Sequence, residues 1–120
     1  MYEGTFSDNV PLISIALRRK KVVEIIDFVL DTGFSESLQI TPEIADSLGL
    51  KRKSASLVEI ADGQIITVPT SYLKVEMEGI KKSVQVMVSY GTPLAGIELF
   101  TQFGYTVIVD CKKREIFLKK

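Results

Sequence analysis

The alternation of apolar and polar residues predicts a chain built mostly from short β-strands. In residues 11–17, apolar Ile13, Ile15 and Leu17 occupy every second position, which is the period of a half-buried strand. Residues 22–30 are rich in Val, Ile and Phe, and both faces are apolar near the end, as in a strand that enters the interior. The two runs predict a hairpin with the basic residues 18–21 in its turn.

Runs of the same kind continue along the chain. The residues that predict further strands are 38–40, 57–61, 64–68, 72–77, 84–88, 105–109 and 115–118. Asp62-Gly63 is a strong turn signal between two of these runs, and Gly79 and Lys112-Lys113 mark the next two turns. The pattern therefore predicts three further hairpins.

Two short helices interrupt the strands. Thr41-Pro42-Glu43 is typical of a helix start, because Thr41 can cap, Pro42 loses no hydrogen bond there, and Glu43 favours the positive helix end. Gly49 predicts the end of this helix, and Gly104 the end of a second over 97–103. Because both helices follow a short apolar strand, the segments 38–49 and 94–104 suggest an internal two-fold repeat.

The amino-acid composition argues against several kinds of catalytic site, metal site and partner. The 120 residues are 46% hydrophobic, which suits one folded domain over 1–120. Fifteen basic and fifteen acidic residues balance, so we expect neither a nucleic acid nor a membrane as partner. The absence of histidine excludes Ser-His and Cys-His catalysis and nearly all zinc sites. With no apolar stretch near the roughly 20 residues of a membrane span and no signal peptide, we expect a cytoplasmic protein.

The most informative motif is Asp31-Thr32-Gly33, directly after the apolar run 28–30. Alone, it is also typical of a turn aspartate that ends a strand. Asp110 ends an apolar strand as well, but Cys111-Lys112 follows it, so we expect a turn residue there.

With its surroundings, the motif resembles the retropepsin-like aspartic proteases of the single-domain archaeal and bacterial branch. The segments that carry the resemblance are 28–33 with Ser35, the helix start 41–50, the hairpin tip Ala61-Asp62-Gly63, and Leu94-Ala95-Gly96 before a helix. It covers nearly the whole chain and implies a mostly β, closed acid-protease barrel with a flap hairpin and one or two short helices. It also implies a homodimeric aspartic endopeptidase that needs no metal or organic cofactor and acts on peptides or unfolded protein.

The resemblance implies a role for each matching residue. Asp31 of each subunit would activate a water molecule, Thr32 would bond across the dimer axis, and Ser35 would donate to the outer oxygen of the carboxylate. Gly33 would allow the tight turn. The flap and substrate-binding residues would be Phe34, Ile60, Ala61, Asp62 and Gly63, whereas Leu94, Ala95 and Gly96 would support the catalytic loop.

Alternatives remain open at this point. Phe34 stands where the family often has alanine, so its ring would narrow a substrate pocket or change how the two loops meet. A catalytically inactive dimer of the same fold, which binds peptides or has only a structural role, is therefore the alternative function. The tails 2–6 and 115–118 are candidates for interface strands and equally for strands that pack in their own chain.

Overall fold

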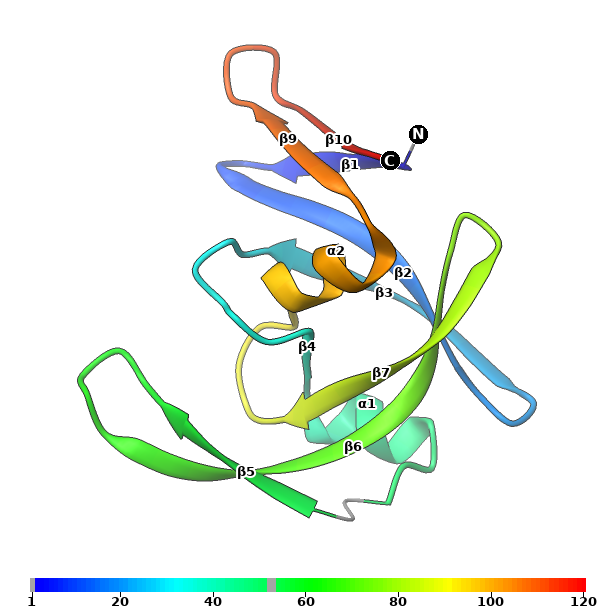
Figure 1. Cartoon of the computed structure of the whole chain (residues 1–120), viewed down its shortest axis with the longest axis vertical. Helices are drawn as coiled ribbons and strands as arrows, with labels where there is room; N and C mark the ends of the chain where they lie inside the picture. Colours follow the sequence, from blue (N-terminus) through cyan, green and yellow to red (C-terminus); the bar gives the residue numbers. More distant parts are fainter. Residues whose placement is uncertain (1, 52–53) are drawn as a thin grey trace.

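The computed structural model describes residues 2–51 and 54–120, and within them the chain is mostly β with two short helices, as predicted (Figure 1). The elements, in chain order, are β1 (Tyr2–Ser7), β2 (Val10–Arg19), β3 (Val22–Leu30), β4 (Leu38–Ile40), α1 (Pro42–Ser47), β5 (Ser54–Glu59), β6 (Ile65–Met77), β7 (Ile80–Val88), β8 (Leu94–Ala95), α2 (Ile97–Phe103), β9 (Thr106–Asp110) and β10 (Glu115–Lys119).

Strand pairing closes the central strands into a barrel. β2 pairs with β3 on one side and with β6 on the other, so the ring β6–β7–β4–β8–β3–β2 returns to β6. β5 pairs with the first half of β6 and extends from the barrel as a hairpin. This arrangement confirms the closed barrel that was expected from the sequence.

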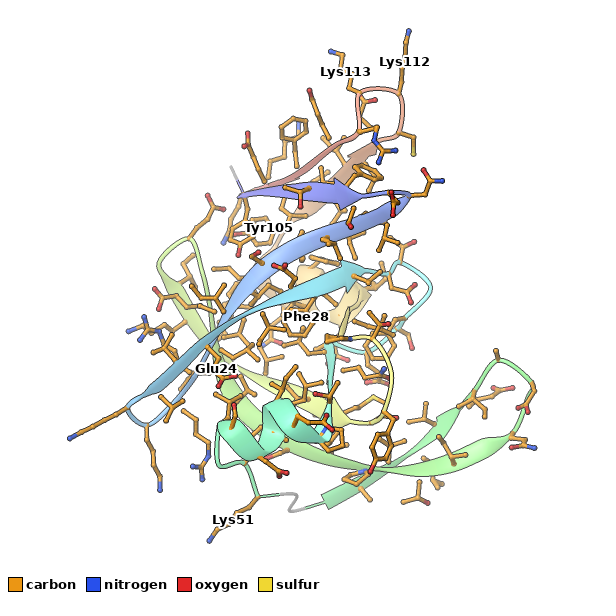
Figure 2. The ribbon with its side chains drawn as sticks, turned by 180° about the vertical axis from the view of Figure 1, so that it is seen from behind. Glu24, Phe28, Lys51, Tyr105, Lys112 and Lys113 are labelled. Atoms are coloured by element: carbon orange, nitrogen blue, oxygen red, sulfur yellow. The ribbon has the colours of Figure 1, made fainter. Side chains whose placement is uncertain are left out.

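The barrel interior is filled by the inward-facing residues of its strands. Ile15 and Leu17 on β2 and Phe28 on β3 are fully buried, and Phe28 lies in the middle of the molecule (Figure 2). Complete burial of a side chain of this size stabilises the fold by roughly 1.5–3 kcal/mol. The alternating pattern in the sequence therefore identifies the core face of this hairpin correctly.

The pairings show the internal two-fold that the repeat suggests. β3 pairs in parallel with β8, β7 pairs in parallel with β4, and β4 and β8 pair antiparallel to each other. Exchanging β3 with β7 and β4 with β8 reproduces the same set of pairings. A short helix follows β4 and β8 alike, so α1 and α2 occupy equivalent places.

The helix boundaries follow the predicted signals. The Thr41 side chain accepts a hydrogen bond from the Ile44 N–H at 3.2 Å, and Pro42 is the first helical residue of α1. Gly49 and Gly104 have φ angles of +68° and +73°, a conformation that glycine adopts without strain. No helix within the described ranges has the length and apolar character needed to span a membrane.

Two predicted boundaries are wrong. Arg18 and Arg19 belong to β2, so only Lys20-Lys21 form the turn; a bond of 2.5 Å from Arg18 Nε to Glu76 Oε1 holds Arg18 against β6. The runs 64–68 and 72–77 form one continuous strand, β6. Pro69 does not end this strand because it pairs with β5 on one edge only; on the other edge the pairing with β7 begins at Thr70, and proline is tolerated where one edge of a strand is unpaired.

The two termini pair within one chain. β1 pairs with β10 from Tyr2–Leu118 to Gly4–Ile116, and β10 pairs in turn with β9. Ile116 and Leu118 are buried in the same core as the barrel residues. Of the two roles that the sequence left open for the tails, the structure shows packing in their own chain.

A tyrosine joins this terminal sheet to the β6–β7 turn. The Tyr105 hydroxyl donates a hydrogen bond to Glu78 Oε1 at 2.7 Å, and the Tyr2 ring centroid lies 6.4 Å from that of Tyr105. Burial raises the pKa of Tyr105, and the bond to Glu78 raises it further. The same bond lowers the pKa of Glu78. The folded chain therefore holds the tyrosine proton more tightly than the unfolded chain does.

We expect the stability to fall as the pH rises above the ordinary tyrosine pKa of about 10. Because the folded pKa is raised, the contribution of Tyr105 is complete below about pH 10 and is lost as the pH increases. The midpoint of urea unfolding, measured from pH 8 to 11, should decline less steeply in Tyr105→Phe than in the wild type. Parallel declines in the two proteins would contradict this role of Tyr105.

Candidate active site

Asp31 lies on a tight loop at the end of a barrel strand. Its N–H donates to the Ala95 carbonyl at 3.0 Å, which continues the pairing of β3 with β8. Its carboxylate accepts a hydrogen bond from the Gly33 N–H at 2.9 Å, and its carbonyl accepts one from the Phe34 N–H at 3.1 Å. The loop therefore turns back on itself and fixes the orientation of a half-exposed carboxylate.

The segment Leu94-Ala95-Gly96 lies directly against this loop. The Gly96 N–H donates to the Ser37 carbonyl at 2.8 Å, and the Ile97 N–H donates to the Phe34 carbonyl at 2.9 Å. A Cβ atom on Gly96 would lie 2.2 Å from the Glu36 carbonyl oxygen and 2.4 Å from that of Phe34. Only glycine fits at this position, because the two backbones touch.

Phe34 contacts the same glycine. Its Cδ2 atom is 2.6 Å from the point that a Gly96 Cβ would occupy, and the side chain is half-buried. One edge of the ring is thus packed on the segment that supports the loop in its own chain. The sequence could indicate that a ring stands beside the Asp31 loop, but not that it is held there by Gly96.

The outer wall of the barrel beside Asp31 is a row that the sequence interpretation missed. Paired residues share a face, so Val29, Leu94, Gln39 and Met87 form a continuous row on four neighbouring strands. By alternation, Asp31 lies on the same side as Val29. Val29, Leu94 and Gln39 are half-exposed, whereas Met87 is buried, so the accessible part of this wall is apolar with one amide in it. Its only signal in the sequence is the spacing of Val29 from Asp31.

The predicted flap is the tip of the β5–β6 hairpin. The Ile60 N–H donates to the Gln64 carbonyl and the Gly63 N–H to the Ile60 carbonyl, both at 2.9 Å. The Asp62 carboxylate accepts a bond from the Gln64 N–H at 2.9 Å, so Asp62 stabilises the turn. Gly63 has a φ of +86°, and a Cβ there would meet nothing within 4 Å. Ala61 is exposed at the same tip.

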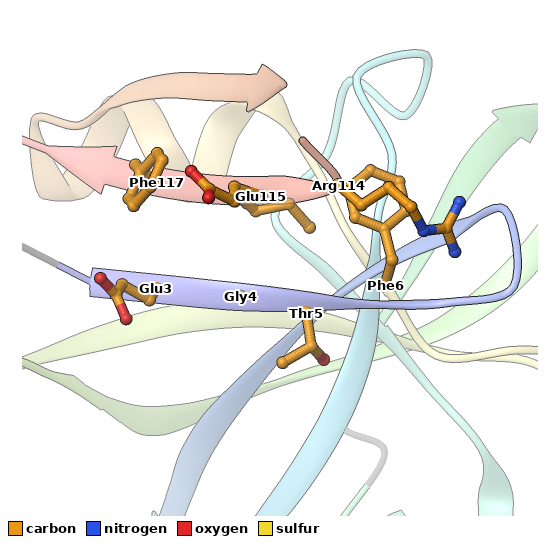
Figure 3. Close-up of a pocket in the computed structure, with 8 residues that line it drawn as sticks. Glu3, Gly4, Thr5, Phe6, Arg114, Glu115 and Phe117 are labelled. Atoms are coloured by element: carbon orange, nitrogen blue, oxygen red, sulfur yellow. The ribbon is translucent and has the colours of Figure 1, made fainter. Parts of the chain in front are cut away.

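Away from Asp31, the described residues line further grooves, of which we consider two. One, of about 380 Å³, is on the terminal sheet, where Arg114 stacks on Phe6 with 5.0 Å from its guanidinium carbon to the ring centroid (Figure 3). Arg114 also donates to the Asp8 carbonyl and to Asn9 Oδ1, so two of its nitrogens already have hydrogen-bond partners within the chain. The other, of about 330 Å³, lies at the base of the β5–β6 hairpin, and Ile66, Val68 and Tyr90 are among its lining residues.

The structure brings some of the predicted residues together and leaves others apart. Residues 31–35 and 94–96 form one hydrogen-bonded unit, whereas 60–63 lie on a separate hairpin on the same side of the molecule as the loop 31–37 (Figure 1). Thr32 and Ser35 are exposed, and no hydrogen bond joins Ser35 to Asp31 within the described part of the chain. Their roles across a dimer axis stay predictions.

A single chain presents one Asp-Thr-Gly loop. Its carboxylate has no second carboxylate of the same motif to face, because the sequence contains the triplet once. In the described ranges, no three or more His, Cys, Asp or Glu side chains are grouped so that they could hold a metal ion. The loop can therefore orient one carboxylate and leave its neighbours Thr32 and Gly33 open to a partner.

Comparison with solved structures identifies the fold. A retropepsin-like aspartic protease from Rickettsia conorii is similar over 97% of this chain and 87% of its own, with a TM-score of 0.69 and 20% sequence identity. EIAV protease, solved in complex with an inhibitor, is similar over 84% of this chain and 94% of its own, with a TM-score of 0.65 and 12% identity. No protein-family model and no curated protein sequence matches the chain. The chain has the retropepsin-like fold.

Proposed function

We propose that the chain is an aspartic endopeptidase that acts as a homodimer and hydrolyses peptide bonds with a water molecule held between Asp31 of each subunit. The observation that carries the proposal is the Asp31 loop. The loop presents a half-exposed carboxylate at the end of a barrel strand. Hydrogen bonds with Ala95 and Gly96 hold the loop in place, and the chain has the fold of solved aspartic proteases. One chain supplies one such carboxylate, and the chemistry needs two.

The mechanism follows from the proximity of two carboxylates. Two such groups about 3 Å apart share one proton, because both cannot ionise comfortably. The ionised Asp31 takes a proton from the water as it attacks the peptide carbonyl, while the protonated Asp31 of the other subunit donates to the developing oxyanion. The Gly33 N–H holds the carboxylate in position, so little reorganisation is needed. No metal or organic cofactor takes part.

The proposed substrate is an extended peptide or a segment of unfolded protein. The hairpin tip 60–63 would close over it and bind its backbone by strand-like hydrogen bonds. The accessible residues of the row, Val29, Leu94 and Gln39, would meet the side chains of the substrate. Because most of this wall is apolar, we expect apolar residues near the cleaved bond.

The alternative is a dimer of the same fold that binds peptides or has only a structural role. Phe34 is the residue that favours it, since a bulky ring beside the loop can obstruct a substrate. The contact of the ring with Gly96 supports the catalytic proposal instead, because one edge of the ring is packed against its own chain.

The test is the dependence of cleavage on protein concentration. Because each site needs two chains, cleavage of an unfolded protein per chain should rise with concentration and level off where sizing shows a dimer. The assay covers pH 3 to 7, with and without a chelator, and the chelator should change nothing. Cleavage per chain that stays constant across concentrations at which the protein is monomeric would overturn the proposal, and so would the absence of cleavage by the dimer.

A further inference from the structure

A basic and apolar surface covers the outside of the barrel on β7, β6, β2 and β3. Two rows of paired residues cross these strands, namely Lys81–Glu76–Ala16–Ile25 and Ser83–Lys74–Arg18–Val23. The opposite face of the same strands belongs to the core, because Leu17 and Val75 pair with each other and are fully buried. The two rows therefore face outward, and we call them, together with Tyr72 and the Lys20-Lys21 turn, the basic face.

The basic face exposes large apolar side chains. Ile25 is 73% exposed, Tyr72 61% and Val23 45%. Tyr72 lies on the same side of β6 as Lys74 and Glu76, two and four residues along the strand. Exposure of these apolar side chains to water is unfavourable. They share the surface with the cations of the basic face, so one partner can contact both.

The cations of the basic face outnumber its carboxylates. Arg18, Lys20, Lys21, Lys74 and Lys81 belong to it, and Glu76, paired with Arg18, is the carboxylate in its two rows. Two further acids lie nearby: the Asp27 carboxylate, beside Ile25 on the same outer side of β3, accepts from the Ser14 hydroxyl, and the Glu24 carboxylate, on the other side of β3, accepts from the Ser47 hydroxyl. Five cations thus stand against Glu76 and Asp27 on this side of the sheet. The zero net charge of the chain therefore hides a local excess of positive charge.

The fold brings Lys51 to the same end of the barrel as the β2–β3 turn. Arg19 Nη1 lies 3.4 Å from the position of a Cβ on Gly49, and Lys51 follows that glycine by two residues. Lys51 and the β2–β3 turn lie at the same end of the molecule, far from Lys112 and Lys113 (Figure 2). Lys51 thus adds a cation at this end of the molecule, next to Arg19, which lies on the opposite side of β2 from Arg18.

We propose that the basic face docks the protein on a membrane surface that contains anionic lipids. Positive charge attracts the protein to such a surface, and exposed aliphatic side chains enter the boundary between headgroups and acyl chains, a combination of signals that gives stable peripheral binding. Tyrosine is enriched at that same boundary. A nucleic acid would use the cations but would leave Ile25 and Val23 in water. The proposal revises the expectation of no membrane partner, which considered only the total charge.

The basic face is compatible with the proposed dimer. The β2–β3 and β6–β7 turns lie on the side of the molecule opposite the loop 31–37 and the flap tip, where a second chain would approach (Figure 1). Membrane binding in this proposal does not require Asp31 or catalysis, so its failure and the failure of the proposed peptidase activity are separate results.

The test is co-sedimentation with vesicles of phosphatidylcholine alone or with 30% phosphatidylserine, at 0.1 and 0.5 M salt. We expect binding to the anionic vesicles at least about tenfold tighter at low salt, and release at high salt. Each cation near such a surface strengthens binding roughly fivefold, so Lys20→Glu/Lys21→Glu should weaken it by at least about 25-fold. Lys112→Glu/Lys113→Glu is the matched control, because it makes the same change in a turn at the other end and should keep wild-type binding.

A second variant separates a membrane from other anionic partners. Ile25→Thr keeps a β-branched residue in the strand and should weaken vesicle binding several-fold, with an unchanged melting temperature. Equal binding to both kinds of vesicle, or equal losses in the two lysine variants, would overturn the proposal. So would a single-stranded oligonucleotide that binds as tightly as the vesicles and is unaffected by Ile25→Thr, because the partner would then be a polyanion.

Discussion

Replacing Asp31 with Asn is expected to abolish peptide cleavage while leaving the fold intact. An amide cannot accept the proton of the attacking water, so the rate should fall by at least about 10³-fold. Asn has nearly the same shape and can still accept the hydrogen bond from the Gly33 N–H, which measures 2.9 Å in the wild type. Circular dichroism and the melting temperature should therefore stay close to the wild-type values. Cleavage by Asp31→Asn at the wild-type rate would exclude Asp31 as the catalytic residue.

Asp110 provides the matched control, because it also ends an apolar strand. Its carboxylate accepts a bond from the Lys113 N–H at 2.9 Å, which an Asn side chain can replace. Asp110→Asn should retain cleavage within about twofold.

Mixing subunits tests whether two copies of Asp31 form one site. Equal amounts of wild type and Asp31→Asn, unfolded and refolded together, should give roughly a quarter of the pairs with two aspartates. Activity should fall to about half of that from the same amount of wild type refolded alone, because half of the wild-type chains are then in mixed pairs. Activity unchanged by the mixing would mean that each chain works independently.

Replacing Gly96 with Ala is expected to destabilise the protein by more than about 3 kcal/mol. The new Cβ would lie 2.2 Å and 2.4 Å from two backbone carbonyl oxygens, of Glu36 and Phe34, and neither can rotate away as a side chain could. To remove this clash, the whole loop 31–37 would have to move, and the hydrogen bonds that Gly96 and Ile97 donate to the loop would be strained or broken. The melting temperature should fall by more than about 10 °C, and any folded fraction should have little activity.

Gly104→Ala is the control for Gly96→Ala. At Gly104, φ is +73° and a Cβ would meet nothing within 4 Å, so the substitution costs about 1 kcal/mol of backbone strain. The two variants therefore compare a steric clash with a purely conformational penalty. Equal losses of stability would mean that the close approach at Gly96 does not constrain the Asp31 loop.

Local signals explain why much of the fold could be predicted. Thr41, Pro42 and Gly49 set the limits of α1 through caps and backbone preferences that act within a few residues. The alternation of Ile13, Ile15 and Leu17 identifies their buried face without knowledge of any partner strand. The prediction failed at Pro69, where the extent of the pairing with β7, which begins at Thr70, decides whether a proline is tolerated.

Only part of the candidate site could be predicted from such local signals. Asp31-Thr32-Gly33 and Leu94-Ala95-Gly96 are recognisable as motifs, and the fold joins them. Gln39 and Met87 carry no motif, and they become part of the wall beside Asp31 only through the pairing of β4 with β8 and β7. The basic face depends in the same way on the pairing of β2 with β6.

The sequence by itself determined most of the strands, the two helices, the inward face of the β2–β3 hairpin and the one residue on which the proposed chemistry depends. These follow from periodicity and short-range backbone preferences, which are properties of neighbouring residues. Only the tertiary structure decided which strands pair, that the tails pack within their own chain, that Phe34 rests on Gly96, and that a chain of zero net charge has a basic face. Those features depend on contacts between residues far apart in the sequence, and no local pattern encodes them.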